Sequence, residues 1–239
     1  MSLSNFDIQL IRPPAVESFR FATTSITLPI GLAYISSSLK ECRLKVDVID
    51  AVGEAPKNRT NYYKGYLVGL GLKEIVEKIN PNTLTVGISV IFTHEWPVVV
   101  KLIFLIKEKF PNIPIILGGE HISAMPEFCL LTSCADYIVM GEGEETIIEL
   151  IKSIKNKTIF QKIAGIGYRN NNQVVINKRR YRRQKIDSIS YPDWDSFNIK
   201  GYHKNRFVGG MYSDKLTIPI LATRGCPYQC TYCSAPNMW

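Results

Sequence analysis

The sequence predicts an α/β protein built on a doubly wound, five-stranded parallel sheet. Short apolar runs alternate with stretches of helical periodicity over the first 155 residues, which is the pattern of strands joined by helical crossovers. The chain has 239 residues, of which 46% are hydrophobic and 21% charged, so it can form one sizeable core. Sixteen glycines and 13 prolines are near average usage, which excludes collagen-like and low-complexity chains.

The elements follow one another in a regular order. Pro13 and Pro14 end the first strand, because proline cannot donate to a ladder, and Pro29 suits the first turn of a helix. The run LTVGISV at 84–90 is almost wholly apolar, as in strands covered on both faces. Strands are expected at 6–11, 44–49, 84–90, 113–117 and 137–140, and helices at 29–42, 67–79, 95–110, 123–131 and 144–155. This is a flavodoxin-like or Rossmann-like arrangement.

The remaining residues divide into a connector and the start of a second unit. A hairpin is expected from 165–169 and 173–177 around three asparagines, and 190–197 has the composition of turns. A further strand is expected at 216–222, just before three clustered cysteines. We therefore predict a first domain at 1–155, a connector at 156–215 and the start of another domain at 216–239.

Charge divides the chain unevenly. Residues 1–150 contain 13 Lys and Arg against 17 Asp and Glu, whereas residues 151–239 contain 16 against 4. Much of the excess comes from one basic run: Lys178, Arg179, Arg180, Arg182, Arg183 and Lys185. Such a run is usually a solvated linker, and RNA binding is the alternative. Tyr181 is the one aromatic within it, so the run lacks the stacking surface of a single-strand binder.

Nothing in the sequence predicts a membrane segment or export. The longest hydrophobic stretch, 97–106, is interrupted by Lys101 and is far shorter than the ~20 residues that cross a bilayer. The first 14 residues lack the features of a secretory signal. Six cysteines are too few for a disulfide scaffold, so we expect a cytoplasmic protein with free thiols.

Two glycine-rich loops follow predicted strands. Residues 118–121 read GGEH and residues 141–144 read GEGE. Ligands of open α/β sheets bind outside the carboxyl ends of the strands, where glycine allows close approach and helix N-termini suit polar or anionic groups. The alternative is that these glycines only form tight turns. Neither loop is a G-x-G-x-x-G dinucleotide fingerprint, which favours another cofactor.

Cys226, Cys230 and Cys233 form a C-x3-C-x2-C triplet. Three thiolates on a short loop can hold three irons of a four-iron cluster and leave the fourth iron open. Zinc is a weaker alternative, because His203 lies 23 residues before Cys226 and no finger-like spacing supplies a fourth ligand. Three unrelated structural cysteines are the remaining possibility.

The triplet, with Tyr232 just before its last cysteine, resembles the cluster loop of the radical S-adenosylmethionine enzymes. Residues 6–155 resemble the cobalamin-binding domain that precedes the barrel in one branch of that superfamily. The matching stretches are LPIGLAY at 28–34, ILGGEH at 116–121 and DYIVMGEGE at 136–144. The two matches occur in the order found in the family.

The resemblance implies three cofactors: cobalamin, a 4Fe-4S cluster and S-adenosylmethionine. The three cysteines would hold the cluster, Tyr232 would lie near the adenine of S-adenosylmethionine, and a reductant protein would be a possible partner. Methyl transfer is the reaction implied by ancestry, although some relatives catalyse rearrangements. The residues expected at the cobalamin site are Pro13, Pro14, Ser89, Phe92, Thr93, Gly118, Gly119, His121, Gly141, Glu142 and Gly143.

The sequence departs from the family pattern in two ways. No Asp is followed two places on by His, so the D-x-H-x-x-G cobalt-ligand motif is absent, and neither His94 nor His121 is assigned as an axial ligand. The chain also stops six residues after Cys233, before nearly all of a radical S-adenosylmethionine barrel. We therefore expect an incomplete and inactive N-terminal part of such an enzyme. A stand-alone cobalamin-binding module is the alternative.

Overall fold

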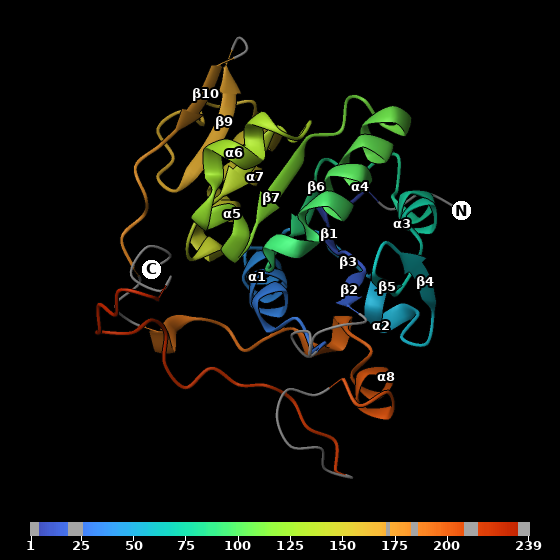
Figure 1. The fold of residues 1–239 in the computed structure, drawn as a ribbon. Helices are drawn as coiled ribbons and strands as arrows, with labels where there is room; N and C mark the ends of the chain where they lie inside the picture. Colours follow the sequence, from blue (N-terminus) through green and yellow to red (C-terminus); the bar gives the residue numbers. More distant parts are fainter. Residues whose placement is uncertain (1–4, 19–25, 171–172, 183–185, 208–214, 234–239) are drawn as a thin grey trace.

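The computed structural model describes residues 5–18, 26–170, 173–182, 186–207 and 215–233. Its centre is a seven-stranded sheet in the order β10-β9-β8-β7-β6-β1-β3 (Figure 1). The five strands at one side of this order are parallel: β1 (Ile8–Arg12), β3 (Val46–Asp50), β6 (Val86–Ser89), β7 (Ile115–Gly118) and β8 (Tyr137–Val139). Numbered among themselves, they run 2-1-3-4-5, the flavodoxin-like order. The predicted doubly wound fold is confirmed.

Helices cover both faces of the sheet. α1 (Ile30–Glu41) and α7 (Gly143–Asn156) pack together on one face. The other face carries α3 (Leu72–Lys78), α4 (Trp96–Lys109), α5 (Glu120–Ala124) and α6 (Pro126–Leu131). Successive strand residues supply the two cores alternately, because side chains of a strand point to opposite faces: Leu10 joins the α1/α7 core and Ile11 the α4 core.

The prediction of a five-stranded sheet was wrong in its extent. The hairpin of β9 (Ile166–Asn170) and β10 (Gln173–Ile176) forms as expected, but β9 also pairs antiparallel with β8 and adds two strands. Periodicity identifies a hairpin but not its neighbour in space, so this pairing was not predicted. Asn171 and Asn172 of the expected turn lie outside the described residues.

A second sheet was not predicted. It joins β2 (Ala15–Ser18), β5 (Gly65–Val68) and β4 (Arg59–Tyr62), all antiparallel. The helix expected at 67–79 was therefore placed too early, since residues 67 and 68 belong to β5. Gly69 has a positive φ of 126°, and the Glu74 carboxylate accepts a 2.6 Å hydrogen bond from the Gly71 amide, which sets the helix start at Leu72.

Two other boundaries also needed correction. The helix expected at 123–131 is two short helices, because Pro126 disfavours helical backbone at Met125 and starts α6. A short helix, α2 (Ala51–Glu54), replaces the loop expected after β3. The strand expected at 216–222 is not a strand: this segment is coil, and the side chains of Leu216, Ile218 and Ile220 are largely exposed. An apolar run forms a strand only when a neighbour pairs with its backbone.

The segment that follows the hairpin runs along the lower edge of the sheet in Figure 1. It contains two 3-10 turns, η2 (Ile186–Ser188) and η3 (Trp194–Ser196), and the helix α8 (Ile199–Lys204). Near η3, Asp193 accepts hydrogen bonds from Ser36 and Lys40 of α1. Among the described residues, no helix is both long and apolar enough to cross a bilayer.

Tyr202 of α8 anchors this segment to the sheet. Its side chain is fully buried, and its hydroxyl bonds to both carboxylate oxygens of Asp50 at 2.8 and 2.9 Å. Arg12 at the end of β1 donates a hydrogen bond to the same hydroxyl, and its guanidinium lies 3.9 Å from Asp50. Burial raises the pKa of Asp50, while the Arg12 charge opposes that rise. The three side chains therefore satisfy one another away from water.

We expect Tyr202→Phe to lower the free energy of unfolding by about 1–3 kcal/mol, because two buried charged groups each lose a hydrogen-bond partner. Urea unfolding of the full chain measures this change. Tyr191→Phe is the matched control, since Tyr191 is 93% exposed and its loss should change stability by less than about 0.5 kcal/mol. Equal stability of the two variants would contradict the anchoring of α8.

Candidate functional site

A cavity of about 300 Å³ lies at the carboxyl ends of the parallel strands. Its walls are mainly apolar and come from β1, β6, β7, β8, α1 and α7, and its edge includes residues 221 and 224. The described lining residues are Leu10, Ile30, Gly31, Leu32, Tyr34, Ile35, Gly87, Ile88, Ser89, Ile91, Ile116, Leu117, Gly118, Gly119, Glu120, Ser123, Val139, Gly141, Glu142, Gly143, Glu144, Ile147, Leu221 and Arg224. This is the edge at which open α/β sheets bind ligands.

Two of the glycines that line the cavity border open space. A Cβ added to Gly31 on α1 would meet no atom within 4 Å, and one added to Gly118 would meet only the Val139 carbonyl at 3.9 Å. Glycine at these positions therefore leaves volume that another residue would fill. Ser89 supplies a polar group, since its hydroxyl makes no hydrogen bond to any residue that the structure describes.

The two glycine-rich loops are tied together. The Ser123 hydroxyl donates to the Gly119 carbonyl at 3.0 Å and accepts from the Gly141 amide at 2.8 Å. Gly119 has a positive φ of 113°, and a Cβ there would collide with the Val90 carbonyl. These glycines form tight turns, which was the alternative considered from the sequence. The same turns also form part of the cavity wall.

The edge of the cavity is charged. Glu144, in the first turn of α7, forms a 2.6 Å ion pair with Arg224, and Glu142 lies 3.9 Å from the same guanidinium. Arg224 also lies over the ring of Tyr34 on α1, with 4.9 Å between the guanidinium carbon and the ring centroid. The N-terminus of α7 thus already carries carboxylates. The expectation that it suits an anion is not supported.

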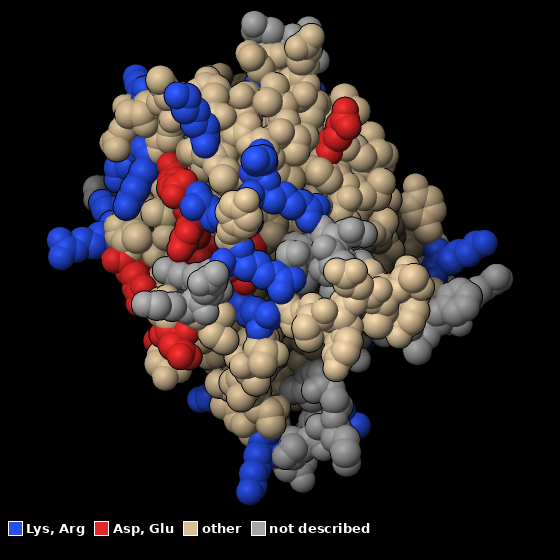
Figure 2. Space-filling model, turned by 90° about the vertical axis from the view of Figure 1, so that its left-hand side faces the viewer, with Lys and Arg blue, Asp and Glu red and all other residues tan. Residues whose placement is uncertain are grey.

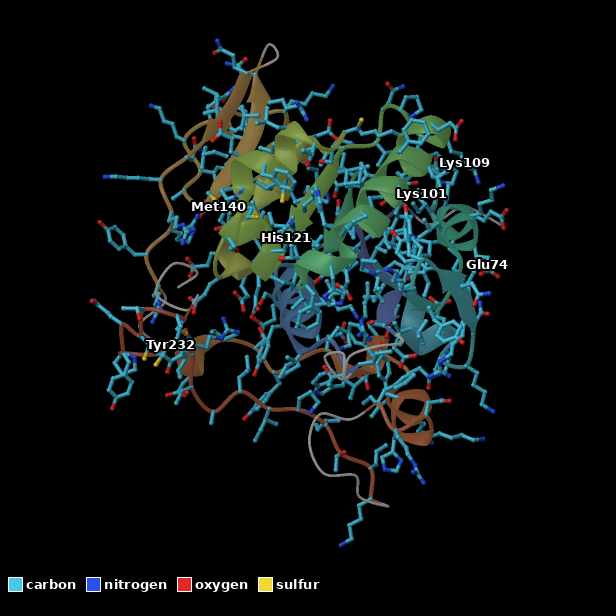
Figure 3. The ribbon with its side chains drawn as sticks, viewed as in Figure 1. Glu74, Lys101, Lys109, His121, Met140 and Tyr232 are labelled. Atoms are coloured by element: carbon cyan, nitrogen blue, oxygen red, sulfur yellow. The ribbon has the colours of Figure 1, made fainter. Side chains whose placement is uncertain are left out.

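His121 holds two loops in place from inside the protein. It is 3% exposed, its Nδ1 lies 3.1 Å from the Thr93 hydroxyl, and its ring packs 5.3 Å from that of Trp96. Burial lowers the pKa of His121, so the neutral ring is favoured. Its Nε2 is buried, and none of the residues that the structure describes forms a hydrogen bond with it. Figure 3 shows His121 in the interior, and this placement supports leaving it unassigned as a cobalt ligand.

Six of the predicted site residues line the cavity: Ser89, Gly118, Gly119, Gly141, Glu142 and Gly143. Five others are elsewhere near the strand ends. Pro13 and Pro14 are buried between β1 and β2, His121 and Thr93 contact each other, and the Phe92 ring stacks on His94 at 5.4 Å. Tyr232 is 91% exposed and lies at the left edge of Figure 3, away from His121. The roles of these six residues remain predictions.

Several lining residues were missed by the sequence analysis. Tyr34 and Gly31 lie within the stretch 28–34 that carried the resemblance, but nothing in the helical period distinguished a cavity wall from core. Arg224 lies two residues before Cys226, the first cysteine of the motif. Only the folded chain shows that its side chain reaches Glu144.

Cys226, Cys230 and Cys233 are exposed on coil. A short turn joins the last two, with the Cys233 amide donating to the Cys230 carbonyl at 3.0 Å. Within the part of the chain that the structure describes, no three His, Cys, Asp or Glu side chains are gathered as metal ligands. Thiolate sites usually assemble as the metal binds, so the donor set fits a cluster although its thiols have not converged.

The basic run is partly paired with acidic residues of α7. Arg180 forms ion pairs with Glu149 at 2.5 Å and Glu145 at 3.4 Å, and Arg179 donates to the Ser123 carbonyl at 2.8 Å. Figure 2 shows Lys and Arg side chains beside Asp and Glu on the face that it presents. These contacts show that the basic run is not a fully solvated linker, since Arg179 and Arg180 bond to residues of α5 and α7. Arg183 and Lys185 lie outside the described residues.

The fold and cavity together define an α/β cofactor-binding protein of flavodoxin-like topology. The B12 binding domain family matches residues 21–151, more than half of the chain, and the chain belongs to this family.

The chain is also similar to several longer proteins. The uncharacterized methyltransferase PH0819 of Pyrococcus horikoshii is 26% identical over 229 residues, which are 95% of this chain and 45% of that protein. The solved structure of the radical S-adenosylmethionine methyltransferase TsrM from Kitasatospora setae superposes with a TM-score of 0.66 at 20% identity, over 97% of this chain and 41% of that one. The structure of the cobalamin-dependent S-adenosylmethionine radical enzyme OxsB superposes with a TM-score of 0.64 at 22% identity, over 86% of this chain and 26% of that one.

The resemblance of residues 6–155 to a cobalamin-binding domain is therefore confirmed, and the two superpositions show that these solved proteins share the fold. The chain spans less than half the length of these relatives.

Glu95 should make stability depend on pH. It ends η1 (Thr93–Glu95), and burial raises its pKa to about 7, against the opposing charge of Arg12. The folded state therefore holds this proton more tightly than the unfolded chain, and the stability it contributes below about pH 4.5 is lost as pH rises through about 7. The free energy of unfolding of Glu95→Gln, compared with that of wild type, should therefore rise by about 2 kcal/mol from pH 5 to pH 8.

Urea unfolding at both pH values measures this difference. Glu108→Gln, at an exposed position of α4, should show no such gain. A pH-independent difference between Glu95→Gln and wild type would contradict the burial of this carboxylate.

Proposed function

We propose that this chain is the cobalamin-binding and cluster-loop portion of a radical S-adenosylmethionine protein that is methyltransferase-like by ancestry. The observation that carries this proposal is the apolar cavity at the carboxyl ends of the strands, in a chain of the B12 binding domain family. The solved relatives whose names include cobalamin or radical S-adenosylmethionine support the same assignment.

The cavity suits one part of cobalamin better than the whole. Its volume of about 300 Å³ is at the lower limit for a ligand site and too small for a corrin ring. A planar aromatic base on a nucleotide tail matches its size, its apolar walls and the open space at Gly31 and Gly118. We therefore place the base of the cobalamin tail in the cavity, with the corrin ring over the loops at 89–95, 118–121 and 141–144.

The described residues would divide the binding work. Leu10, Ile88 and Ile147 would pack on the base, and the Ser89 hydroxyl would bond to a polar atom of the tail. Cobalamin supplies a cobalt centre that carries methyl groups, and a three-cysteine cluster supplies the electron that cleaves S-adenosylmethionine. Cys226, Cys230 and Cys233 are the residues that would hold that cluster, Tyr232 would lie beside the adenine, and a reductant protein would supply the electron.

A stand-alone cobalamin-binding module is the second candidate. The family match favours it, because the B12 binding domain covers residues 21–151 and ends before the three clustered cysteines. The two candidates share the cavity and differ in the cysteine loop, so iron binding separates them.

Filling the cavity should abolish cobalamin retention without unfolding the protein. In Gly31→Leu the new side chain would occupy open space and replace a poor helix former in α1, so thermal stability should be unchanged or higher. We expect cobalamin retained after desalting to fall at least roughly tenfold, as for loss of one buried aromatic group.

Lys73→Leu adds the same side chain to the exposed surface of α3 and should retain cobalamin like wild type. Retention by Gly31→Leu equal to that of this control would remove the cavity from the binding site.

The cysteine triplet should determine iron binding. After anaerobic reconstitution with iron and sulfide, the chain should hold about four irons and as many sulfides. The Cys226→Ala, Cys230→Ala, Cys233→Ala triple variant should lose both. Cys42→Ala with Cys134→Ala is the control, because these cysteines are also exposed but lie outside the triplet. Iron without acid-labile sulfide would indicate a different metal site, and iron retained by the triple variant would refute the assignment.

A further inference from the structure

The strongest link between the cysteine loop and the cavity is Arg224. Its guanidinium contacts Glu144 at 2.6 Å, Glu142 at 3.9 Å and the Tyr34 ring at 4.9 Å, so it joins α7 to α1 across the cavity edge. The Arg224 and Glu144 side chains are only 10% and 9% exposed. Removing one partner of an ion pair that is so little exposed destabilises the structure, because the other charge is left buried without a counter-charge.

The Arg224–Glu144 ion pair also restricts the position of Cys226, which follows two residues later. Two residues span at most about 7 Å, so fixing Arg224 also confines Cys226 close to the cavity edge. Gly225 between them has a positive φ of 78°, and a Cβ there would collide with the Arg182 guanidinium. The chain therefore turns sharply after Arg224 and passes between the cavity and the basic run.

The rest of this segment has few other attachments. Residues 215–233 form no strand or helix, and most of their side chains are exposed, including Ile220, Tyr228 and Tyr232. Leu221 and Arg224 are the members of the segment that line the cavity. The ion pair thus connects a segment with little structure of its own to the rigid end of a 14-residue helix.

We propose that Arg224 is a positioning residue: its ion pair with Glu144 latches the cysteine loop over the cavity, and it couples retention of a cobalamin tail in the cavity to anchoring of that loop. The coupling rests on the proposed cobalamin function, whereas the latch itself does not. A ligand covered by Leu221 and Arg224 would stabilise the closed loop, and the closed loop would by reciprocity raise the affinity for the ligand.

Limited proteolysis of the full chain tests the latch without a cofactor. Chymotrypsin cleavage next to Leu221, Tyr228 and Tyr232 should be at least roughly fivefold faster in Arg224→Gln and in Glu144→Gln than in wild type, because opening of the segment becomes more populated. The double variant should be cleaved no faster than either single variant, since both remove one interaction. Arg180→Gln removes two ion pairs with the same helix and should resemble wild type.

Hydroxocobalamin binding tests the coupling. Arg224→Gln should bind it at least roughly fivefold more weakly than wild type and Arg180→Gln, mainly through faster release. Unchanged cleavage in both single variants would refute the latch, whatever the cofactor result. Equal or tighter cobalamin binding by Arg224→Gln would refute the coupling. Failure of wild type itself to bind cobalamin would refute the proposed function, while the cleavage rates would still decide on the latch.

Discussion

Parallel pairing of β3, β1, β6, β7 and β8 is the constraint on which the site depends. It brings the carboxyl ends of five strands to one edge, so the loops that follow them must share that edge. Helices cover both faces of the sheet, and the apolar walls of the cavity lie where α1, α7 and the strand ends meet. Gly31 and Gly118 border this junction, and a Cβ added at either would find open space.

Two clusters of charged and polar side chains attach the C-terminal half of the chain to this edge of the sheet. Arg12, Asp50 and Tyr202 form a buried set that fixes α8 beneath β1 and β3. Arg224 and Glu144 form the other, at the cavity itself. In each cluster, a residue at or just after the end of a strand contacts a residue more than 75 positions away in the sequence. The segment with the greatest positive charge is thus held by specific ion pairs, and its charge is partly neutralised where it meets α7.

The sequence predicted the elements of the parallel sheet well, because its strands are short segments rich in apolar residues and the main helices show helical periodicity. The errors arose where a neighbour in space decides the structure. β9 pairs with β8, β2 pairs with β5, and the apolar run at 216–222 finds no strand partner among the described residues. Local pattern contains no information about such pairing.

The same distinction applies to the site. Gly118, Gly119, Gly141 and Gly143 could be predicted, because glycine after a buried strand indicates a close approach of backbone to ligand. Arg224 could not, since its role depends on a carboxylate 80 residues earlier in the chain. His121 was predicted at the cobalamin site, and the structure shows its ring buried against Trp96 rather than lining the cavity, so its role there stays a prediction.

The central claim is that the cavity accepts the aromatic base of a cobalamin tail, and the most direct test compares two corrinoids. Hydroxocobalamin contains the nucleotide tail, whereas cobinamide has the same ring without it. Equilibrium titration of the chain should give at least roughly tenfold tighter binding of hydroxocobalamin, as expected when an aromatic group of this size is buried. Equal affinity for the two would show that the cavity does not hold the tail.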